Sequence, residues 1–384
     1  MKSIKLLGTT LVAALLALQL SGCIPFAGQN IGFLDRNFVE KLHNQRDAQH
    51  IRIEELRGFS EGVAWGQRSD GHFVLLDHSG KTKAFKEFQV STVSDFSEGL
   101  AAVRERKIDA LTKKTINGEV GFVDQDLNWR IPPRFTNCNS FAEGLAAVEI
   151  DGAWGFIDRD GKVAISPRFQ SASVFSEGLC EVCITTPTGI KSGFIDHSGN
   201  FVIAPKFDKL YAHLVRKTNP GWEELMMDGS ELRFDGRPMI EHIPAFGIFK
   251  HGLAPVCIGG RIGFIDHHGK FVISPKYAYA SSFSEGKAIV SADSLEKFGF
   301  IDVKGNVAIS EKFRFVLPFK SGLACGIVGS IMRDDFSYFN HDGIKQGSYS
   351  SRYCGSFSEG VAPFGMGTVN PPWWNRDVPM SMSM

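Results

Sequence analysis

The sequence predicts an all-β fold built as a tandem array of short repeated units. An aromatic residue, a small polar residue, Glu and Gly recur along the 384-residue chain, as in FSEGLAAV from Phe96 and FAEGLAAV from Phe141. A recurrence with a fixed period is typical of repeat proteins, in which each unit packs on its neighbours. The glycines of these stretches are Gly62, Gly99, Gly144, Gly178, Gly252, Gly286, Gly322 and Gly360.

The spacing of these glycines sets the expected number of units. Successive glycines are 34 to 38 residues apart, except for one gap of 45 and one gap of 74. The larger gap equals two periods, so we expect a degenerate unit within Leu210–Pro238. The gap of 45 indicates an insertion, which we place at Arg104–Asn117. The array should then hold about nine units of about 36 residues.

The clearest unit, residues 141–169, predicts three antiparallel strands. Its apolar runs at 145–150, 153–158 and 162–166 are separated by the turn signals Asp151-Gly152 and DRDG at 158–161. Gly accepts the positive φ of tight turns, and Asp side chains cap turn amides. Pro167 ends the third run because it has no N–H for a ladder. Each unit is therefore expected to be a three-stranded meander plus a connecting segment.

Both faces of each small sheet are expected to be buried. The second strand carries adjacent Phe and Ile in GFID, as at Phe264 and Ile265, and adjacent residues of a strand point to opposite faces. Neighbouring units must cover those faces. We expect the Gly of each FSEG stretch to permit a turn, and the Glu to accept hydrogen bonds from nearby backbone amides.

The pattern resembles the bacterial WG repeat family, also called KWG repeats. The resemblance rests on F-S-E-G-L-A-x-V, then W-G-F-I-D, then G-x-x-V-I-x-P-x-F, and spans residues 59–365. Trp154-Gly155 carries the naming dipeptide. The molecular function of the family is poorly defined, so the resemblance implies an architecture rather than an activity. Elsewhere the position before Gly holds Val120, Ser192, Ile262 or Phe298.

The ends of the array suggest how it closes. IGFLD at Ile31–Asp35 resembles the second strand of a unit, and the last unit ends at FSEGVAPF without a following GFID. The two partial units could complete one another, as in propellers. The segment that follows Ile31–Asp35 and precedes the array, residues 36–58, looks more helical than strand-like. We favour a propeller-like closed array over an open β-solenoid.

The N-terminus predicts lipid attachment. Lys2 and Lys5 precede an apolar run at Leu6–Leu20, which is too short for a comfortable membrane span. The following LSGC resembles the lipobox of bacterial lipoproteins, which implies cleavage after Gly22 and a lipid on Cys23. The alternative is an ordinary signal peptide with a chance Cys. In a Gram-negative source, Ile24 after the lipidated Cys would favour the outer membrane.

These observations divide the chain into four parts. Residues 1–22 are the expected lipoprotein signal peptide, and 23–58 are the lipidated N-terminus with a linker or partial repeat. Residues 59–365 form the WG-type array. The Pro- and Met-rich end, 366–384, is expected to be a disordered tail.

No residue is assigned to catalysis, to a cofactor or to a metal. The chain lacks GxSxG, HExxH, P-loop and dinucleotide motifs. Cys180 and Cys183 form a C-x-x-C, but on a strand they face opposite sides, so we interpret them as small core residues. The disulfide state of the six cysteines other than Cys23 is left open. The histidines of one recurrent turn form an exposed edge rather than a cluster: His78, His197, His267 and His268.

The sequence therefore predicts a non-enzymatic scaffold in the bacterial cell envelope, held on the membrane through Cys23. The net charge is zero and the pI is near 7.2, so nothing favours nucleic-acid binding. The expected partner is a protein or an envelope polymer. The alternatives are an envelope hydrolase or other enzyme with a site in the array, and a structural spacer. Specificity is expected in the parts that do not repeat, Arg104–Asn117 and Leu210–Pro238.

Overall fold

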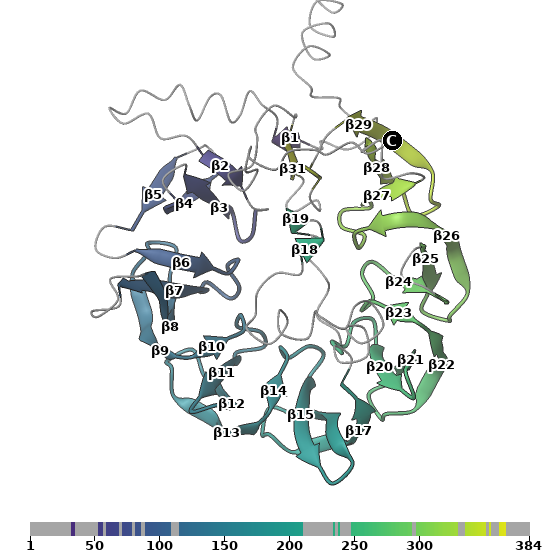
Figure 1. Ribbon diagram of the computed structural model, residues 1–384, viewed down its shortest axis with the longest axis horizontal. Helices are drawn as coiled ribbons and strands as arrows, with labels where there is room; N and C mark the ends of the chain where they lie inside the picture. The colour runs from purple at the N-terminus through teal and green to yellow at the C-terminus, as the bar shows by residue number, and fades with distance from the viewer. Residues whose placement is uncertain are drawn as a thin grey trace, which may run out of the picture.

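The computed structural model describes residues 32–34, 53–56, 59–68, 71–78, 81–85, 89–108, 115–209, 233–234, 237–238, 247–293, 297–328, 335–350, 353–354 and 361–365. Every regular element in these residues is a β-strand. The strands form small sheets arranged around a ring (Figure 1). The predicted all-β, propeller-like array is confirmed. Among the described residues there is also no helix long and apolar enough to cross a membrane.

The described strands group into eight units in chain order. Units 1 and 2 contain β2 (Ile53–Leu56), β3 (Val63–Arg68), β4 (Phe73–Asp77), β5 (Thr82–Ala84), and β6 (Val90–Val93), β7 (Ala101–Ile108), β8 (Thr115–Val123), β9 (Trp129–Phe135). Units 3 and 4 contain β10 (Asn137–Cys138), β11 (Ala146–Ile150), β12 (Ala153–Ile157), β13 (Val163–Phe169), and β14 (Ser171–Ala172), β15 (Cys180–Thr186), β16 (Gly189–Ile195), β17 (Phe201–Asp208).

The later units follow the same order. Units 5 and 6 contain β20 (Ala254–Ile258), β21 (Arg261–Ile265), β22 (Phe271–Tyr277), and β23 (Tyr279–Ala280), β24 (Lys287–Ser291), β25 (Phe298–Asp302), β26 (Val307–Val316). Unit 7 contains β27 (Ala324–Val328), β28 (Asp335–Phe339) and β29 (Lys345–Ser350). Unit 8 contains β30 (Tyr353–Cys354), β31 (Val361–Gly365) and β1 (Gly32–Leu34).

Unit 3 shows how the predicted meander is built. Strands β11, β12 and β13 pair antiparallel in sequence order, as expected. The connecting segment adds a short fourth strand, because β10 pairs with β11. This short strand lies nearest the ring axis and β13 lies at the periphery (Figure 1). The prediction of three antiparallel strands plus a connector was therefore correct in strand order, but the connector contains a fourth strand.

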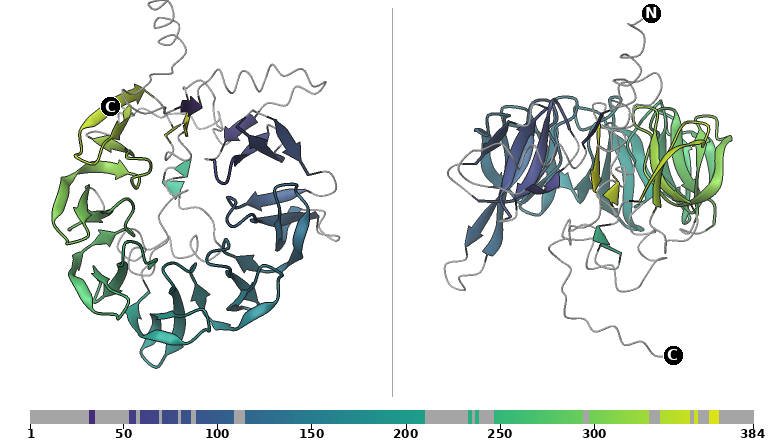
Figure 2. Two further views of the ribbon diagram at one scale, coloured as in Figure 1. Left: turned by 180° about the vertical axis from the view of Figure 1, so that it is seen from behind. Right: turned by 90° about the horizontal axis from the view of Figure 1, so that it is seen from above.

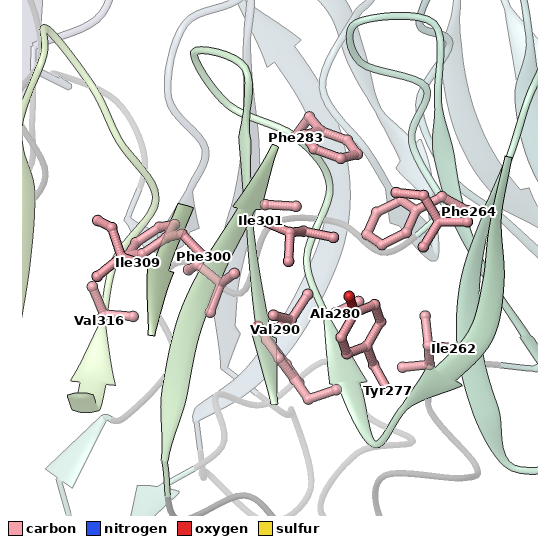
Figure 3. Packing of buried hydrophobic residues seen from close by; sticks show 14 of the residues in the cluster. Ile262, Phe264, Tyr277, Ala280, Phe283, Val290, Phe300, Ile301, Ile309 and Val316 are labelled. Carbon is pink, nitrogen blue, oxygen red and sulfur yellow. The ribbon is translucent and has the colours of Figure 1, made fainter. Parts of the chain in front are cut away.

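The hydrophobic core lies between units as well as within them. Phe264 and Ile265 are both fully buried, and they belong to separate clusters on opposite faces of unit 5. Figure 3 shows Phe264 close to Phe283 of unit 6; their ring centroids are 4.9 Å apart. Burial of one such side chain stabilises the fold by roughly 1.5–3 kcal/mol. The expectation that neighbouring units cover both faces is confirmed.

The expected degenerate unit is not a unit of the ring. Strands β17 and β20 pair directly, through Asp208 and Cys257, so units 4 and 5 are neighbours. The described residues of Leu210–Pro238 form β18 (Arg233–Phe234) and β19 (Arg237–Pro238), which pair only with each other. The gap of 74 residues is one period plus an insertion of similar length. The predicted nine units are therefore eight in the described part of the chain.

The two ends of the array are joined by strand pairing. Strand β1 pairs with β31 from Gly32–Val361 to Leu34–Pro363. The expectation that IGFLD completes the last unit is confirmed, although the pairing is parallel, whereas second strands elsewhere pair antiparallel. The expectation of helix in residues 36–58 is wrong for Ile53–Leu56, which form β2. Most of the remaining residues of that segment lie outside the described part.

The ring has two distinct faces, which follow from the strand directions. In unit 3 the FAEG stretch leads into β11 and the DRDG stretch follows β12, and these strands are antiparallel. Both stretches therefore lie at one end of the sheet, on what we call the turn face. The β11–β12 turn at Asp151-Gly152 lies at the other end, on the hairpin face. Figure 2 shows the extended β7–β8 hairpin and the β18–β19 hairpin projecting beyond the same side of the ring.

Candidate interaction faces

Each FSEG-type stretch from unit 1 to unit 7 forms a tight two-residue turn, which we call an inner turn because these turns lie at the inner side of the ring. Ser60 and Val63 exchange backbone hydrogen bonds across Glu61 and Gly62. The φ angles of Glu61 and Gly62 are 55° and 82°. Two successive positive φ values define a type I′ turn, in which Gly is preferred at the second position. The predicted role of the Gly is confirmed.

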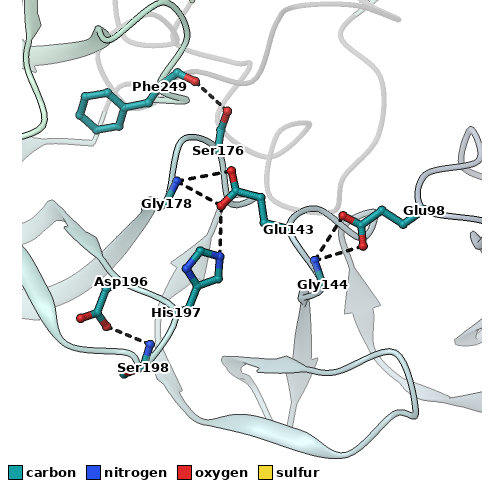
Figure 4. A network of polar contacts seen from close by, with 9 residues as sticks. All are labelled: Glu98, Glu143, Gly144, Ser176, Gly178, Asp196, His197, Ser198 and Phe249. Atoms are coloured by element: carbon teal, nitrogen blue, oxygen red, sulfur yellow. Dashed lines mark hydrogen bonds and ion pairs between the residues drawn. The ribbon is translucent and has the colours of Figure 1, made fainter.

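The Glu of an inner turn links its unit to the next one. The Glu98 carboxylate accepts a hydrogen bond from the Gly144 backbone N–H, and Glu143 accepts one from Gly178 (Figure 4). The acceptor and donor therefore lie in turns of consecutive units, which sequence spacing alone did not indicate. The predicted capping of backbone amides is confirmed. The same contact joins Glu61 to Gly99, Glu177 to Gly252 and Glu285 to Gly322, each at 2.9 Å.

The Ser of an inner turn makes a second bond between units. The Ser176 hydroxyl donates to the Phe249 carbonyl at 2.7 Å (Figure 4), and Ser97 donates to the Phe141 carbonyl at the same distance. Ser60 and Ser284 donate equivalently to Phe96 and Phe319. The repeated polar residues of the motif are thus occupied in holding adjacent units together.

The DxxG stretches form turns farther from the axis, here called outer turns. The Asp158 carboxylate accepts hydrogen bonds from the backbone N–H groups of Asp160 and Lys162. The same pattern in unit 5 lowers the pKa of Asp266, chiefly through the bond from the Lys270 amide. The prediction that these Asp residues cap turns is confirmed. Among the described residues, no group of three or more His, Cys, Asp or Glu is placed to hold a metal ion.

The histidines of the outer turns are spread over units 1, 4, 5 and 7, as expected, with His267 and His268 adjacent in unit 5. His197 stacks on Phe175 at 4.4 Å between centroids, and its Nε2 lies 3.1 Å from the Glu143 carboxylate (Figure 4). His267 and His341 make the equivalent contacts in units 5 and 7. His78 also stacks on a motif Phe, Phe59, at 4.0 Å. These histidines support the inner turns rather than form a shared site.

The cysteines of the C-x-x-C are buried free thiols. Cys180 packs in the core between units 3 and 4, and both Cys180 and Cys183 lie on β15. Burial raises the pKa of Cys183 to about 11 and that of Cys138 to about 12. A thiol with a raised pKa holds little thiolate, which makes it unreactive. The prediction of core residues is confirmed. Cys325, whose state the sequence left open, is disulfide-bonded.

Sequence reasoning missed one partly buried acid, Glu181. It occupies the position of the buried Ala102 and Ala147 in units 2 and 3. Its carboxylate lies against Gly247, where an added Cβ would fall 1.9 Å from Glu181 Oε2. Burial raises the pKa of Glu181 to about 7, which the Ser192 hydroxyl and the Lys209 ammonium partly oppose. Aligning the repeats would have shown the Ala-to-Glu change, but not the contact.

The described parts of both stretches that depart from the repeat lie on the hairpin face. The Arg104–Asn117 stretch extends the β7–β8 hairpin, in which Ile108 pairs with Thr115. The Arg104 guanidinium fixes the root of this hairpin on unit 3, by bonds to the Thr136 carbonyl and to Asn137 Oδ1. The second stretch begins after β17, at the end of the sheet where the hairpins lie. The lipidation residue predicted at Cys23 lies outside the described residues.

The family model of the WG containing repeat matches the chain at residues 121–152, 154–184, 193–212, 262–295 and 298–325. The chain carries WG-containing repeats. All five matches begin within the second strand of a unit, at the Gly of the WG position or one residue before it. The resemblance inferred from the motif residues is confirmed. The insertion between Lys209 and Gly247 falls between the WG repeats of units 4 and 5.

A comparison with curated proteins finds no match. Among solved structures, similar chains include a streptogramin B lyase, with 12% identity and a TM-score of 0.38, over 71% of this chain and 89% of that one. A dihydro-heme d1 dehydrogenase NirN in complex with DHE is 14% identical, with a TM-score of 0.42, over 77% of this chain and 65% of that one. Hsv2 from Kluyvelomyces marxianus is 10% identical, with a TM-score of 0.37, over 75% of this chain and 92% of that one. Likeness at this level says nothing about the activity of the WG-repeat chain.

Proposed function

We propose that this chain is a membrane-anchored bacterial lipoprotein whose WG-repeat array serves as a binding scaffold in the cell envelope. The observation that carries the proposal is that the β7–β8 and β18–β19 hairpins, the described parts of the two stretches departing from the repeat, project on the hairpin face of one ring (Figure 2). Repeat arrays provide large rigid surfaces, and binding specificity arises where the units differ. The partner is expected to be a protein or an envelope polymer.

The repeated residues support this proposal because they serve the ring itself. The Glu98 carboxylate and the Ser97 hydroxyl both bond to backbone groups of unit 3. A surface that holds its units through side chain–backbone bonds keeps its shape while other positions vary. The hairpin face uses none of these motif residues, so it can change in sequence without loss of the ring.

Lipid attachment is tested by metabolic labelling of the full chain. Growth with radiolabelled palmitate should label the wild type, whereas Cys23→Ala should lose the label because the thiol that carries the lipid is gone. Cys138→Ala is the matched control, since Cys138 is a free thiol of the array. Equal labelling of the wild type and Cys23→Ala would contradict the lipoprotein assignment.

The scaffold role is tested by crosslinking in intact envelopes, followed by affinity purification. A variant in which residues 106–118 are replaced by Asp-Gly copies the short turn of unit 3, where Asp151 and Gly152 join paired strands. We expect the wild type to yield a specific partner and this variant to lose most of it. The Lys162→Ser variant, changed at an exposed outer-turn position, should retain the partner. Recovery of no partner with the wild type would favour the spacer.

A further inference from the structure

Two inner turns depart from the motif in the same way. Units 5 and 7 read FKHG and FKSG where the others read FSEG or FAEG. The backbone is unchanged, because His251 and Ser321 keep φ angles of 56° and 51°. Each change replaces a small residue by Lys and removes the carboxylate. The substitutions therefore alter charge at the turn face without altering the turn.

These changes divide the turn face by charge. The inner turns of units 1 to 4, residues 59–63, 96–100, 141–145 and 175–179, contain four Glu and no Lys or Arg, a net charge of −4. Those of units 5 to 7, residues 249–253, 283–287 and 319–323, contain three Lys and one Glu, a net charge of +2. We call Lys250, Lys287 and Lys320 the basic arc.

The three turns of the basic arc lie side by side. The Gly286 N–H donates to His251 Nε2 at 3.2 Å, which joins the turns of units 5 and 6. The Gly322 N–H donates to Glu285 Oε2 at 2.9 Å, which joins units 6 and 7. The basic arc is thus a continuous strip of three neighbouring turns rather than a set of scattered lysines.

The lysines of the basic arc have no role in holding the ring. Lys250 and Lys320 are exposed and Lys287 is half-buried, and none of their ammonium groups bonds to another described residue. The Ser that Lys250 replaces in other units donates to the carbonyl of the next unit, as Ser60 does to Phe96. Lys250 and Lys320 therefore each give up a bond between units and leave their charge in solvent, whereas unit 6 keeps Ser284 and its bond to the Phe319 carbonyl.

We propose that the basic arc binds a short acidic segment of a partner protein. The strip is open and spans only three turns, so it fits an extended segment better than a single small ion. Glu177 lies in the adjoining turn of unit 4, and the motif of unit 8 carries Glu359 in sequence. A long uniform polyanion that extends beyond the arc would meet the Glu177 carboxylate and be repelled. This surface lies on the face opposite the one assigned above, so the two assignments can fail separately.

The test restores the residues of the repeat itself. Lys250→Ser with Lys320→Ser recreates the Ser found at positions 60, 97, 176 and 284, so the turn geometry is preserved. The full chain in neutral detergent is titrated against fluorescein-labelled hexaglutamate, and anisotropy is followed at rising salt. We expect the wild type to bind with an affinity that falls as salt rises, because the contacts are exposed ion pairs. The double variant should bind about tenfold more weakly, a loss of about 1.4 kcal/mol.

The matched control is Lys162→Ser with Lys270→Ser, which removes the same charge from exposed outer-turn positions. It should bind as the wild type does. A second variant, His251→Glu with Ser321→Glu, adds the missing carboxylates and should also weaken binding. Equal losses in the control and the arc variant would overturn the proposal, as would no binding by the wild type. Tighter arc-dependent binding of long-chain polyphosphate than of hexaglutamate would overturn it in favour of a polymer.

Discussion

Substitution of Gly155 by Ala is expected to lower the free energy of unfolding by about 3 kcal/mol or more. A Cβ at this position would lie 2.6 Å from the Ile165 carbonyl oxygen and 2.7 Å from the Pro167 nitrogen. Both are backbone atoms of β13, where the pairing with β12 shifts register. Backbone in a packed sheet cannot move aside as a flexible side chain can, so the clash must distort the unit.

The comparison that decides this prediction is Gly152→Ala, in the hairpin turn of the same unit. Gly152 has a φ of 79°, but nothing lies within 4 Å of an added Cβ. Adoption of a left-handed conformation by Ala costs roughly 1–2 kcal/mol. Chemical denaturation should therefore show a larger loss for Gly155→Ala than for Gly152→Ala. An equal or larger loss for Gly152→Ala would show that backbone conformation, rather than close approach of β13, fixes these glycines.

The same close approach explains which half of the WG dipeptide persists. Where Trp154 of unit 3 is replaced by Val120, Ser192, Ile262 or Phe298, the Gly remains. At each of those glycines an added Cβ would lie 2.5–2.6 Å from a carbonyl oxygen of the outer strand. The position before the Gly holds half-buried aromatic residues at Trp154 and Phe298 and buried smaller residues at Val120, Ser192 and Ile262, so it accepts different side chains. The dipeptide is therefore a packing signature, not a binding site.

The local parts of the fold were predictable because they depend on neighbours in sequence. Asp151-Gly152 marks a hairpin, Pro167 marks the end of a ladder, and adjacent Phe and Ile mark two buried faces. The contacts between units were not predictable in detail, since Glu98 and Gly144 are 46 residues apart. The number of units was wrong because the insertion after Lys209 is about one period long. Length alone cannot distinguish such an insertion from a degenerate unit.

The candidate surfaces were predictable in part, because local departures from the repeat can be read in the sequence. Arg104–Asn117 stood out because it lengthens a unit, and the structure shows that it extends a hairpin. The basic arc was visible in sequence as FKHG and FKSG, but its meaning needed the contact between consecutive turns. Neither the role of Glu181 nor its contact with Gly247 could be predicted from the sequence, because one Ala-to-Glu change inside an apolar run resembles ordinary variation.

Replacement of Glu181 by Gln is expected to make the protein more stable at pH 8 than the wild type. The pKa of Glu181 is raised by burial to about 7, from an unfolded value near 4.5. Below about pH 4.5 the carboxyl is neutral in both states and costs nothing. As the pH rises to 7 and above, the folded state must bury a charge that the unfolded state leaves in water. A shift of this size corresponds to up to about 3 kcal/mol of stability lost across that range.

The measurement is the difference in unfolding free energy between Glu181→Gln and the wild type at pH 5 and pH 8. Gln keeps the shape beside Gly247 but cannot ionise, so the difference should rise by about 2–3 kcal/mol in favour of the variant at the higher pH. Glu181→Ala, which installs the residue of units 2 and 3, should show the same rise. A difference that stays constant with pH in Glu181→Gln would mean that this carboxylate is solvated in the folded protein.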